Sequence, residues 1–272
     1  MRIFVPILSI VLLAIGANAA PLTAEPQAQH ESRHIGLLKS RASNPPHKPG
    51  TKEILHLNKT SKNEYSSNRA GAVLIGTDYT VATAEFIVPT PQVPIGGVGN
   101  KRYCASAWVG IDGDTCGTAI LQTGVDFCVQ GSSASFSAWY EWYPDYAYEF
   151  NDISISAGDL IRVTVDATSK TSGTATVDNI STGRSVSHTF NSGIQGDLCG
   201  YNAEWIVEDF ESNNSLVPLA NFGTVTFYNS DAISRKSIVG PSGATLIDIK
   251  QDNRILTSSS IDGNSVTVEY VA

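Results

Sequence analysis

The chain has 272 residues, of which 42% are hydrophobic and only 16% are charged. This low charged share excludes a disordered polyelectrolyte and a long charged helix. The net charge is −8, and because an acidic surface repels phosphate backbones we expect no nucleic-acid partner.

Residues 1–19 have the pattern of a secretory signal peptide. Met1 and Arg2 precede an apolar run over residues 3–16, and Ala17-Asn18-Ala19 puts small residues at positions −3 and −1 of a cleavage site. A membrane anchor is the alternative, but the apolar run is too short to span a bilayer. We therefore predict a secreted, extracellular protein with no membrane partner.

The next segment, residues 20–63, is rich in Pro, His, Lys, Ser and Asn and has little periodic apolar pattern. Residues 20–69 carry a net charge of +4, whereas residues 70–272 carry −13. A disordered linker is one interpretation of this composition. The signal peptide and the change of charge favour another: residues 20–63 are a basic propeptide that covers and inhibits an acidic body at 64–272.

From residue 70 onward the pattern predicts β-strands throughout. Short alternating apolar runs are separated by Gly, Asn, Asp, Ser and Pro, and no long stretch has helical periodicity. The expected strands are residues 72–75, 81–88, 106–111, 135–143, 153–155, 160–165, 174–177, 203–207, 224–227 and 266–271. Two sheets are needed to bury so many half-apolar strands, so we predict an all-β, two-sheet antiparallel β-sandwich.

Two features of the predicted body concern processing. The Pro- and Gly-rich loop at residues 89–102 ends in the dibasic pair Lys101-Arg102, which makes it a candidate cleavage site. Three Asn-x-Ser/Thr sequences, at Asn58, Asn179 and Asn213, predict a glycoprotein, although Asn58 would leave with the propeptide.

The body contains four cysteines, at positions 104, 116, 128 and 199. An even number in a secreted protein predicts two disulfides, and three connectivities are open. A zinc site is disfavoured because there is no Cys-x-x-Cys pair and the body has a single histidine, His188. We expect no metal and no cofactor.

Nucleophilic catalysis finds little support. His188 lies in Ser-Val-Ser-His-Thr-Phe without a Gly-x-Ser-x-Gly nearby, which fits an ordinary strand residue better than a general base. The cysteines are expected to be paired, so carboxylate chemistry remains.

Three segments are unusual for strands. In Ala119–Gly124 the polar Gln122 shares a face with Ile120, and a buried amide there would need hydrogen-bond partners. An edge-strand amide that faces water is the alternative interpretation. In Ser137–Pro144 aromatic residues lie on both faces, which fits either one face lining a cleft or a cross-strand aromatic ladder.

The third segment is Asn202–Phe210, where Glu204, Ile206 and Glu208 share one face. Burial and mutual repulsion can raise the pKa of two such carboxyls, and a carboxyl of this kind can act as general base and acid at acidic pH. A solvated strand face is the alternative.

The strings Ala107–Cys116, Ala119–Gly124, Trp139–Pro144 and Asn202–Phe210, in this order, resemble the fungal glutamic peptidases, also called eqolisins. The resemblance extends over about residues 64–272. It implies a secreted acid endopeptidase on a jelly-roll-like, concanavalin-like sandwich, made as a zymogen, acting as a monomer on polypeptides without metal or cofactor. It also implies a catalytic dyad of Gln122 and Glu208, with Glu204 in a neighbouring role.

The resemblance implies further residue roles. Positions that line or support the family's substrate cleft match Trp108, Asp112, Glu141 and Tyr143. The family's disulfide maps to Cys116–Cys199, which leaves Cys104 to pair with Cys128. One position departs from the pattern: relatives usually have Asn-Trp-(Ala/Ser)-Gly near the start of the body, and this chain has Asn68-Arg69-Ala70-Gly71.

Two other classes share some of these features. A secreted β-sandwich with Trp139, Glu141 and Glu208 fits a two-carboxylate glycosidase with aromatic sugar platforms, and the same fold also hosts lectin-like binding modules. Gln122 and the propeptide favour the peptidase, because a glycosidase has no use for a fixed amide at that place.

Overall fold

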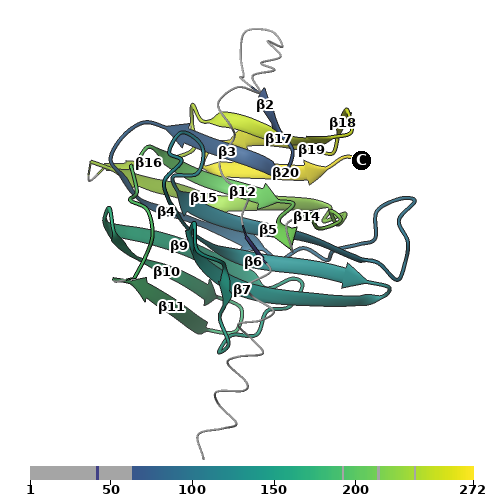
Figure 1. Cartoon of the computed structure of the whole chain (residues 1–272). Helices are drawn as coiled ribbons and strands as arrows, with labels where there is room; N and C mark the ends of the chain where they lie inside the picture. The colour runs from purple at the N-terminus through teal and green to yellow at the C-terminus, as the bar shows by residue number, and fades with distance from the viewer. Residues whose placement is uncertain (1–40, 43–62, 192, 213–214, 236) are drawn as a thin grey trace, which may run out of the picture.

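The computed structural model describes residues 41–42, 63–191, 193–212, 215–235 and 237–272. The predicted signal peptide, and the predicted propeptide apart from residues 41–42 and 63, lie outside this part of the chain, as do Asn58 and Asn213. All regular secondary structure in the described residues consists of β-strands (Figure 1). The described residues contain no helix that is long and apolar enough to cross a membrane.

Two large sheets make up the body. The first sheet has the order β18-β17-β3-β12-β5-β6-β7-β8 with β2 beside β17, which are the segments Arg254–Ile255, Thr245–Gln251, Arg69–Ile75, Asn202–Glu208, Arg102–Ile111, Ile120–Gln130, Ser133–Tyr143, Tyr148–Glu149 and Asn63–Ser66. The second sheet has the order β11-β10-β9-β4-β15-β20-β19 with β16 beside β15, which are Arg184–Phe190, Ser172–Asn179, Leu160–Ser169, Tyr79–Ile87, Thr224–Ser234, Ser265–Tyr270, Thr257–Asp262 and Ser237–Val239.

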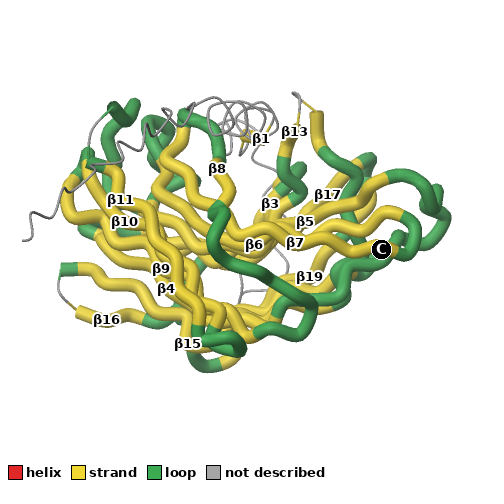
Figure 2. The backbone as a smooth tube through the Cα atoms, turned by 90° about the horizontal axis from the view of Figure 1, so that it is seen from below, coloured by secondary structure: helices red, strands yellow, loops and turns green. Residues whose placement is uncertain are grey.

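A third, small sheet has the order β1-β13-β14, with the bounds Arg41–Ala42, Glu211–Ser212 and Ser215–Leu216. All paired strands run antiparallel except β2, which is parallel to β17. Figure 2 shows the layers, with β4, β9 and β15 in one and β3, β5 and β6 in the other. The predicted two-sheet antiparallel β-sandwich is confirmed.

The facing sides of the two sheets share one hydrophobic core, as the period-two alternation of strands requires. From β12 of the first sheet, Ala203, Trp205 and Val207 belong to it. From the second sheet, Phe86 and Phe227 meet edge to face with their ring centroids 5.5 Å apart. The core therefore sits between the sheets and leaves the other side of each sheet for other purposes.

The first sheet is buried on its other side as well, which we call its outer face. Every residue of β12 is buried, whereas β9 and β10 alternate as one-sided strands do. A second, smaller apolar cluster covers the outer face and consists of Val73, Trp108, Trp139, Ala147, Ile206 and Ile247. Polar side chains on this face are consequently held in surroundings with little water.

Most predicted strands fall within observed ones, and the exceptions have physical causes. Residues 153–155 were predicted as a strand but pair with no neighbour. Ile153 and Ile155 instead pack against the core from an extended segment, so their alternation reflects burial without a ladder. Several observed strands were not predicted, among them β17 and β19. Strand β19 reads Thr-Ser-Ser-Ser-Ile-Asp and has almost no apolar signal, whereas β17 was missed although it contains Leu246, Ile247 and Ile249.

Both disulfides have the connectivity that the resemblance implied. Cys104 and Cys128 are direct cross-strand partners on β5 and β6, with Cα atoms 4.1 Å apart. Cys116, in the loop after β5, joins Cys199, which precedes β12, at a Cα distance of 6.0 Å. No thiol remains free for catalysis among the described residues.

The two processing features differ in accessibility. Lys101 and Arg102 are both exposed, as a cleavage site requires. The side chain of Asn179 is fully buried, and its Nδ2 donates hydrogen bonds to the Ser154 carbonyl oxygen at 3.0 Å and to Asp159 Oδ2 at 2.8 Å. A glycan would replace one of the two hydrogens on that nitrogen and so remove one of these two hydrogen bonds.

Candidate active site

The predicted site residues lie on the outer face of the first sheet. Because cross-strand partners of an antiparallel sheet point to the same side, the register places Glu204, Gln122 and Glu141 in one row, with Gly110 between the first two. Glu208 lies on the same face of β12, four residues further along the strand, in a row with Ser106 and Asp126. Four chain segments distant in sequence thus contribute to one polar patch.

Two glycines let an indole ring lie close to this face. A Cβ at Gly124 would come within 2.5 Å of Trp108 Cβ, and one at Gly110 would lie 3.0 Å from Trp108 Cζ3. Side chains at these two positions would push the ring away from the sheet. The fully buried Trp108 is thereby fixed next to Glu208.

The carboxyl of Glu208 is fully buried and accepts three hydrogen bonds. Trp108 Nε1 donates to Oε2 at 3.0 Å, Asn68 Nδ2 donates to Oε1 at 3.1 Å, and Arg69 Nε donates to Oε1 at 3.4 Å. All three groups can only donate, so the arrangement suits an ionised carboxylate, which can only accept.

The carboxyl of Glu204 has a different environment. It is 1% exposed, and within the described part of the chain neither of its oxygens accepts a hydrogen bond. Burial raises the pKa of Glu204 well above its usual value; Arg69 opposes this, and the negative charges of Asp114, Asp112 and Glu208 add to it. Glu204 is therefore held in its protonated form in acid.

Gln122 and Glu141 are both fully buried, which excludes the interpretation of Gln122 as an edge amide facing water. The half-buried Tyr143 follows on the same face of β7. Burial raises the pKa of Tyr143, the charge of Glu141 adds to this, and Arg69 opposes it. Tyr143 thus remains a neutral hydroxyl near Glu141 and Arg69.

Asp112 lies at the end of β5 and organises the chain that enters β12. Its backbone is left-handed, with φ of 66°, and its two carboxyl oxygens accept hydrogen bonds from the backbone N–H groups of Cys199, Gly200, Tyr201 and Asn202 at 2.7 to 3.3 Å. Burial raises its pKa, and these four hydrogen bonds oppose the rise. Asp112 thus fixes the segment that leads into β12, the strand that carries Glu204 and Glu208.

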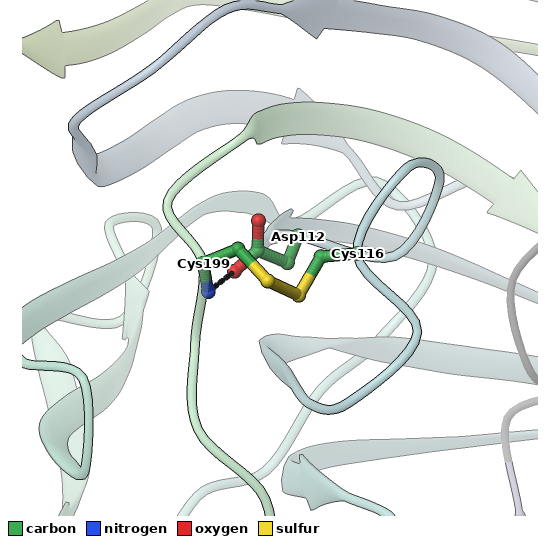
Figure 3. A group of neighbouring side chains, drawn as sticks. All are labelled: Asp112, Cys116 and Cys199. Atoms are coloured by element: carbon green, nitrogen blue, oxygen red, sulfur yellow. Dashed lines mark hydrogen bonds between the residues drawn. A yellow bond between two sulfur atoms is a disulfide. The ribbon is translucent and has the colours of Figure 1, made fainter.

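Asp112 also lies beside the Cys116–Cys199 disulfide (Figure 3). The carboxylate and the two sulfur atoms are within 4.8 Å of one another, a spacing that would suit a metal. The two sulfur atoms are already bonded to each other in the disulfide, however, and a cysteine binds a metal as a thiolate. This cluster is a structural anchor.

The residue whose role sequence reasoning missed is Arg69. Its Nη1 donates to the Gly113 carbonyl oxygen at 2.9 Å and lies 3.8 Å from Glu204 Oε2, while its Nε is 3.4 Å from Glu208 Oε1. The guanidinium also stacks over the Trp108 ring, 5.2 Å from its centroid. The departure from Trp at this position was the available signal, but only the pairing of β3 with β12 reveals the contact.

A family model described as the peptidase A4 family matches residues 67–270. This chain belongs to the peptidase A4, or eqolisin, family. It is 59% identical to aspergillopepsin-2 of Aspergillus niger, over 98% of this chain and 99% of that protein. It is 42% identical to scytalidopepsin B of Scytalidium lignicola, over 75% of this chain and 78% of that one.

Solved eqolisin structures have the same fold. Scytalido-glutamic peptidase with a transition-state analog inhibitor matches with a TM-score of 0.70 and 41% identity, covering 76% of this chain and 99% of that one. Aspergilloglutamic peptidase from Aspergillus niger matches with a TM-score of 0.61 and 67% identity, covering 62% of this chain and 99% of that one. This eqolisin is accordingly a glutamic endopeptidase, and the family predicted from the sequence is confirmed.

Proposed function

We propose that this eqolisin is a secreted acid endopeptidase, made as a zymogen, in which Glu208 and Gln122 form the catalytic dyad. The environment of Glu208 carries the proposal. It is a buried carboxyl with three donors directed at its oxygens, on the same face as a buried Gln. Donors directed at a carboxyl favour its carboxylate form, and a carboxylate can act as a general base in an acid peptidase.

The mechanism follows from the two side chains. The Glu208 carboxylate takes a proton from a water molecule, and the resulting hydroxide oxygen forms a bond to the scissile carbonyl carbon. The Gln122 amide donates a hydrogen bond to the developing oxyanion, a contribution of roughly 3–4 kcal/mol for a preorganised donor. Glu208 then gives its proton to the leaving amine as the peptide C–N bond breaks.

The choice of Glu208 over Glu204 rests on protonation. Glu204 shares its row with Gln122, but burial without hydrogen-bond donors keeps its carboxyl protonated, and a protonated carboxyl cannot accept a proton from water. Glu208 has the donors that Glu204 lacks. Glu204 accordingly lies beside the dyad without acting as its base.

Polypeptides are the expected substrates, bound over the outer face of the first sheet. Trp108, Glu141 and Tyr143 all belong to this face, and they are the residues proposed for substrate binding. Asp112 supports the site from behind through the segment before β12. The chain is proposed to act as a monomer.

The zymogen proposal is supported by charge and by one strand pairing. The propeptide belongs to a segment of charge +4, and the body carries −13. Arg41 and Ala42 form β1, which pairs with β13, and β13 begins three residues after Glu208. A propeptide strand fixed there would hold the rest of the propeptide close to the proposed base and inhibit it.

The function is tested with the mature body at pH 3. Wild-type protein should hydrolyse casein and leave a polysaccharide intact. Glu208→Gln keeps the shape of the side chain but removes the base, so casein hydrolysis should fall to background, whereas Glu204→Gln should keep most of it. Circular dichroism checks that each variant is folded.

Three results would contradict the proposal. Full turnover by Glu208→Gln together with an inactive Glu204→Gln would show that the wrong glutamate was chosen. Full turnover by both variants would exclude a glutamate base on β12. Polysaccharide cleavage that depends on Glu141 and Glu208 would favour a glycosidase.

A further inference from the structure

Arg69 is a buried cation at the proposed active site. Its side chain is 8% exposed and faces Glu208, which is fully buried, and Glu204, which is 1% exposed. Of the described residues, only Arg69 brings a cation within 4.0 Å of either carboxyl. Its guanidinium is fixed on three sides, by Glu208, by the Gly113 carbonyl oxygen and by the face of the Trp108 ring.

The other charged groups around this pair are acidic. Within β12 and just after it are Glu204 and Asp209, and the loop after β5 contributes Asp112 and Asp114. Strand β6 contributes Asp126, in the row of Glu208, and β7 contributes Glu141 and the neutral hydroxyl of Tyr143. Among the described residues around Glu208, Arg69 is therefore the cation set against these acidic groups.

We propose that Arg69 is a positioning residue that holds Glu208 in its carboxylate form and extends the peptidase activity to lower pH. The inference rests on the proposed function, because it requires Glu208 to be the general base. A buried cation next to a carboxyl favours the charged form of that carboxyl, and only the charged form can accept a proton from water.

The size of the effect follows from the distances. An opposite charge at about 4–6 Å shifts the protonation of a carboxyl by about one to three pH units. The Arg69 guanidinium is shared between Glu208, Glu204 and the Gly113 carbonyl oxygen. We therefore expect the lower end of this range, about one unit.

The test measures kcat/KM for a synthetic peptide between pH 2 and pH 6 in four variants of the mature protein. Arg69→Met and Arg69→Trp remove the charge, and Arg69→Lys keeps it. The control is Arg162→Met, which removes an arginine that pairs with Glu85 on the second sheet. Melting curves show which variants are folded.

At the acidic end of the pH profile, kcat/KM falls as pH decreases, and we call this part of the curve the acid limb. In Arg69→Met and Arg69→Trp the midpoint of the acid limb should rise by about one pH unit, and at pH 3 kcat rather than KM should fall. The limb should stay within a few tenths of a unit of wild type in Arg69→Lys and Arg162→Met. Because Met and Trp both remove the charge, the comparison of Trp with Lys remains available if the Met variant does not fold.

An acid limb that stays in place in folded Arg69→Trp, in a protein whose activity still requires Glu208, would overturn this inference and leave the proposed function intact. An equal shift in Arg69→Lys would also overturn it, because hydrogen-bond geometry and not charge would then be the cause. Full activity of Glu208→Gln would overturn the proposed function and this inference together.

Discussion

Glu204 and Glu208 have the same chemistry, lie on the same face of one strand and still differ in their surroundings. The difference comes from their partners: Glu208 accepts hydrogen bonds from Trp108, Asn68 and Arg69, whereas the buried carboxyl of Glu204 accepts none from the described residues. Two carboxyls in different environments are the usual means by which a site separates a base from a neutral neighbour.

At the same scale, Gln122→Glu tests whether the amide acts as a donor. A glutamate has the same shape, but an ionised carboxylate cannot donate to an oxyanion, so kcat should fall by at least about 100-fold wherever the new carboxyl is ionised. The control is Gln130→Glu, at the exposed end of the same strand. Peptide hydrolysis measured from pH 2 to pH 6 decides the matter, and wild-type turnover of Gln122→Glu at a pH where the new carboxyl is shown to be ionised would exclude the oxyanion role.

At the scale of elements, the first sheet differs from an ordinary sandwich sheet in being buried on both faces. Strands β3, β12, β5, β6 and β7 supply the site, and the same outer face carries a second apolar cluster. Rigid strands position side chains more accurately than loops do. An irregular segment at the site, residues 199–201, is fixed by Asp112 and a disulfide.

Asp112→Asn should loosen this segment. The variant replaces one acceptor oxygen by an NH₂ group that faces backbone N–H donors, which leaves buried donors unpaired at about 1–3 kcal/mol each. We expect a lower melting temperature at pH 4 and a fall in kcat, because β12 begins at Asn202. The exposed Asp262, the last residue of β19, provides the control Asp262→Asn. A melting temperature equal to that of the control would contradict the anchoring role.

At the scale of the whole molecule, buried acids link stability to pH. Burial raises the pKa of Asp209 to about 7, with Gln251 opposing the rise and Glu208 adding to it. Burial also raises the pKa of Glu204, Asp112 and Asp248. A carboxyl whose folded pKa is raised stabilises the fold below its unfolded pKa, near 4, and this contribution is lost as pH rises through the folded pKa.

The mature body should therefore be less stable at neutral than at acidic pH. The free energy of unfolding should fall by on the order of a few kcal/mol between pH 4 and pH 7. Asp209→Asn should flatten this fall, because an amide does not titrate in this range. In the wild-type protein Gln251 Nε2 donates a hydrogen bond to Asp209 Oδ2 at 2.7 Å, and the amide oxygen of the variant can accept the same hydrogen bond. Thermal melts at half-unit pH steps measure the effect, and a melting temperature that rises steadily from pH 4 to pH 7 would refute it.

The zymogen should respond to acid at the same scale. Segment 20–69, at +4, attracts the body, at −13, near neutral pH, and its four histidines add positive charge as pH falls through about 6.5. Below about pH 4 the carboxylates of the body become protonated and the attraction fades. The proenzyme should therefore stay intact at pH 7 and process itself at pH 3, as followed by electrophoresis and mass spectrometry. A proenzyme that remains inactive and uncut at pH 3 would contradict release by acid.

The sequence by itself determined the features that depend on local pattern. Period-two alternation put Glu204 and Glu208 on one face of a strand, and the strings around Gln122 and Glu208 identified the family, its fold and its disulfides. Local pattern was misleading at residues 153–155, where apolar alternation served burial without pairing, and it was silent at β19.

Only the tertiary structure decided which partners surround each of the two glutamates. Arg69 and Glu208 are 139 residues apart in sequence, and they meet because β3 pairs with β12 in one register. Burial on both faces of the first sheet arises in the same way, from strands and side chains that no local window contains. Burial and neighbouring charges are properties of the folded arrangement, so the sequence could name the two carboxyls but not the donors and charges that surround each.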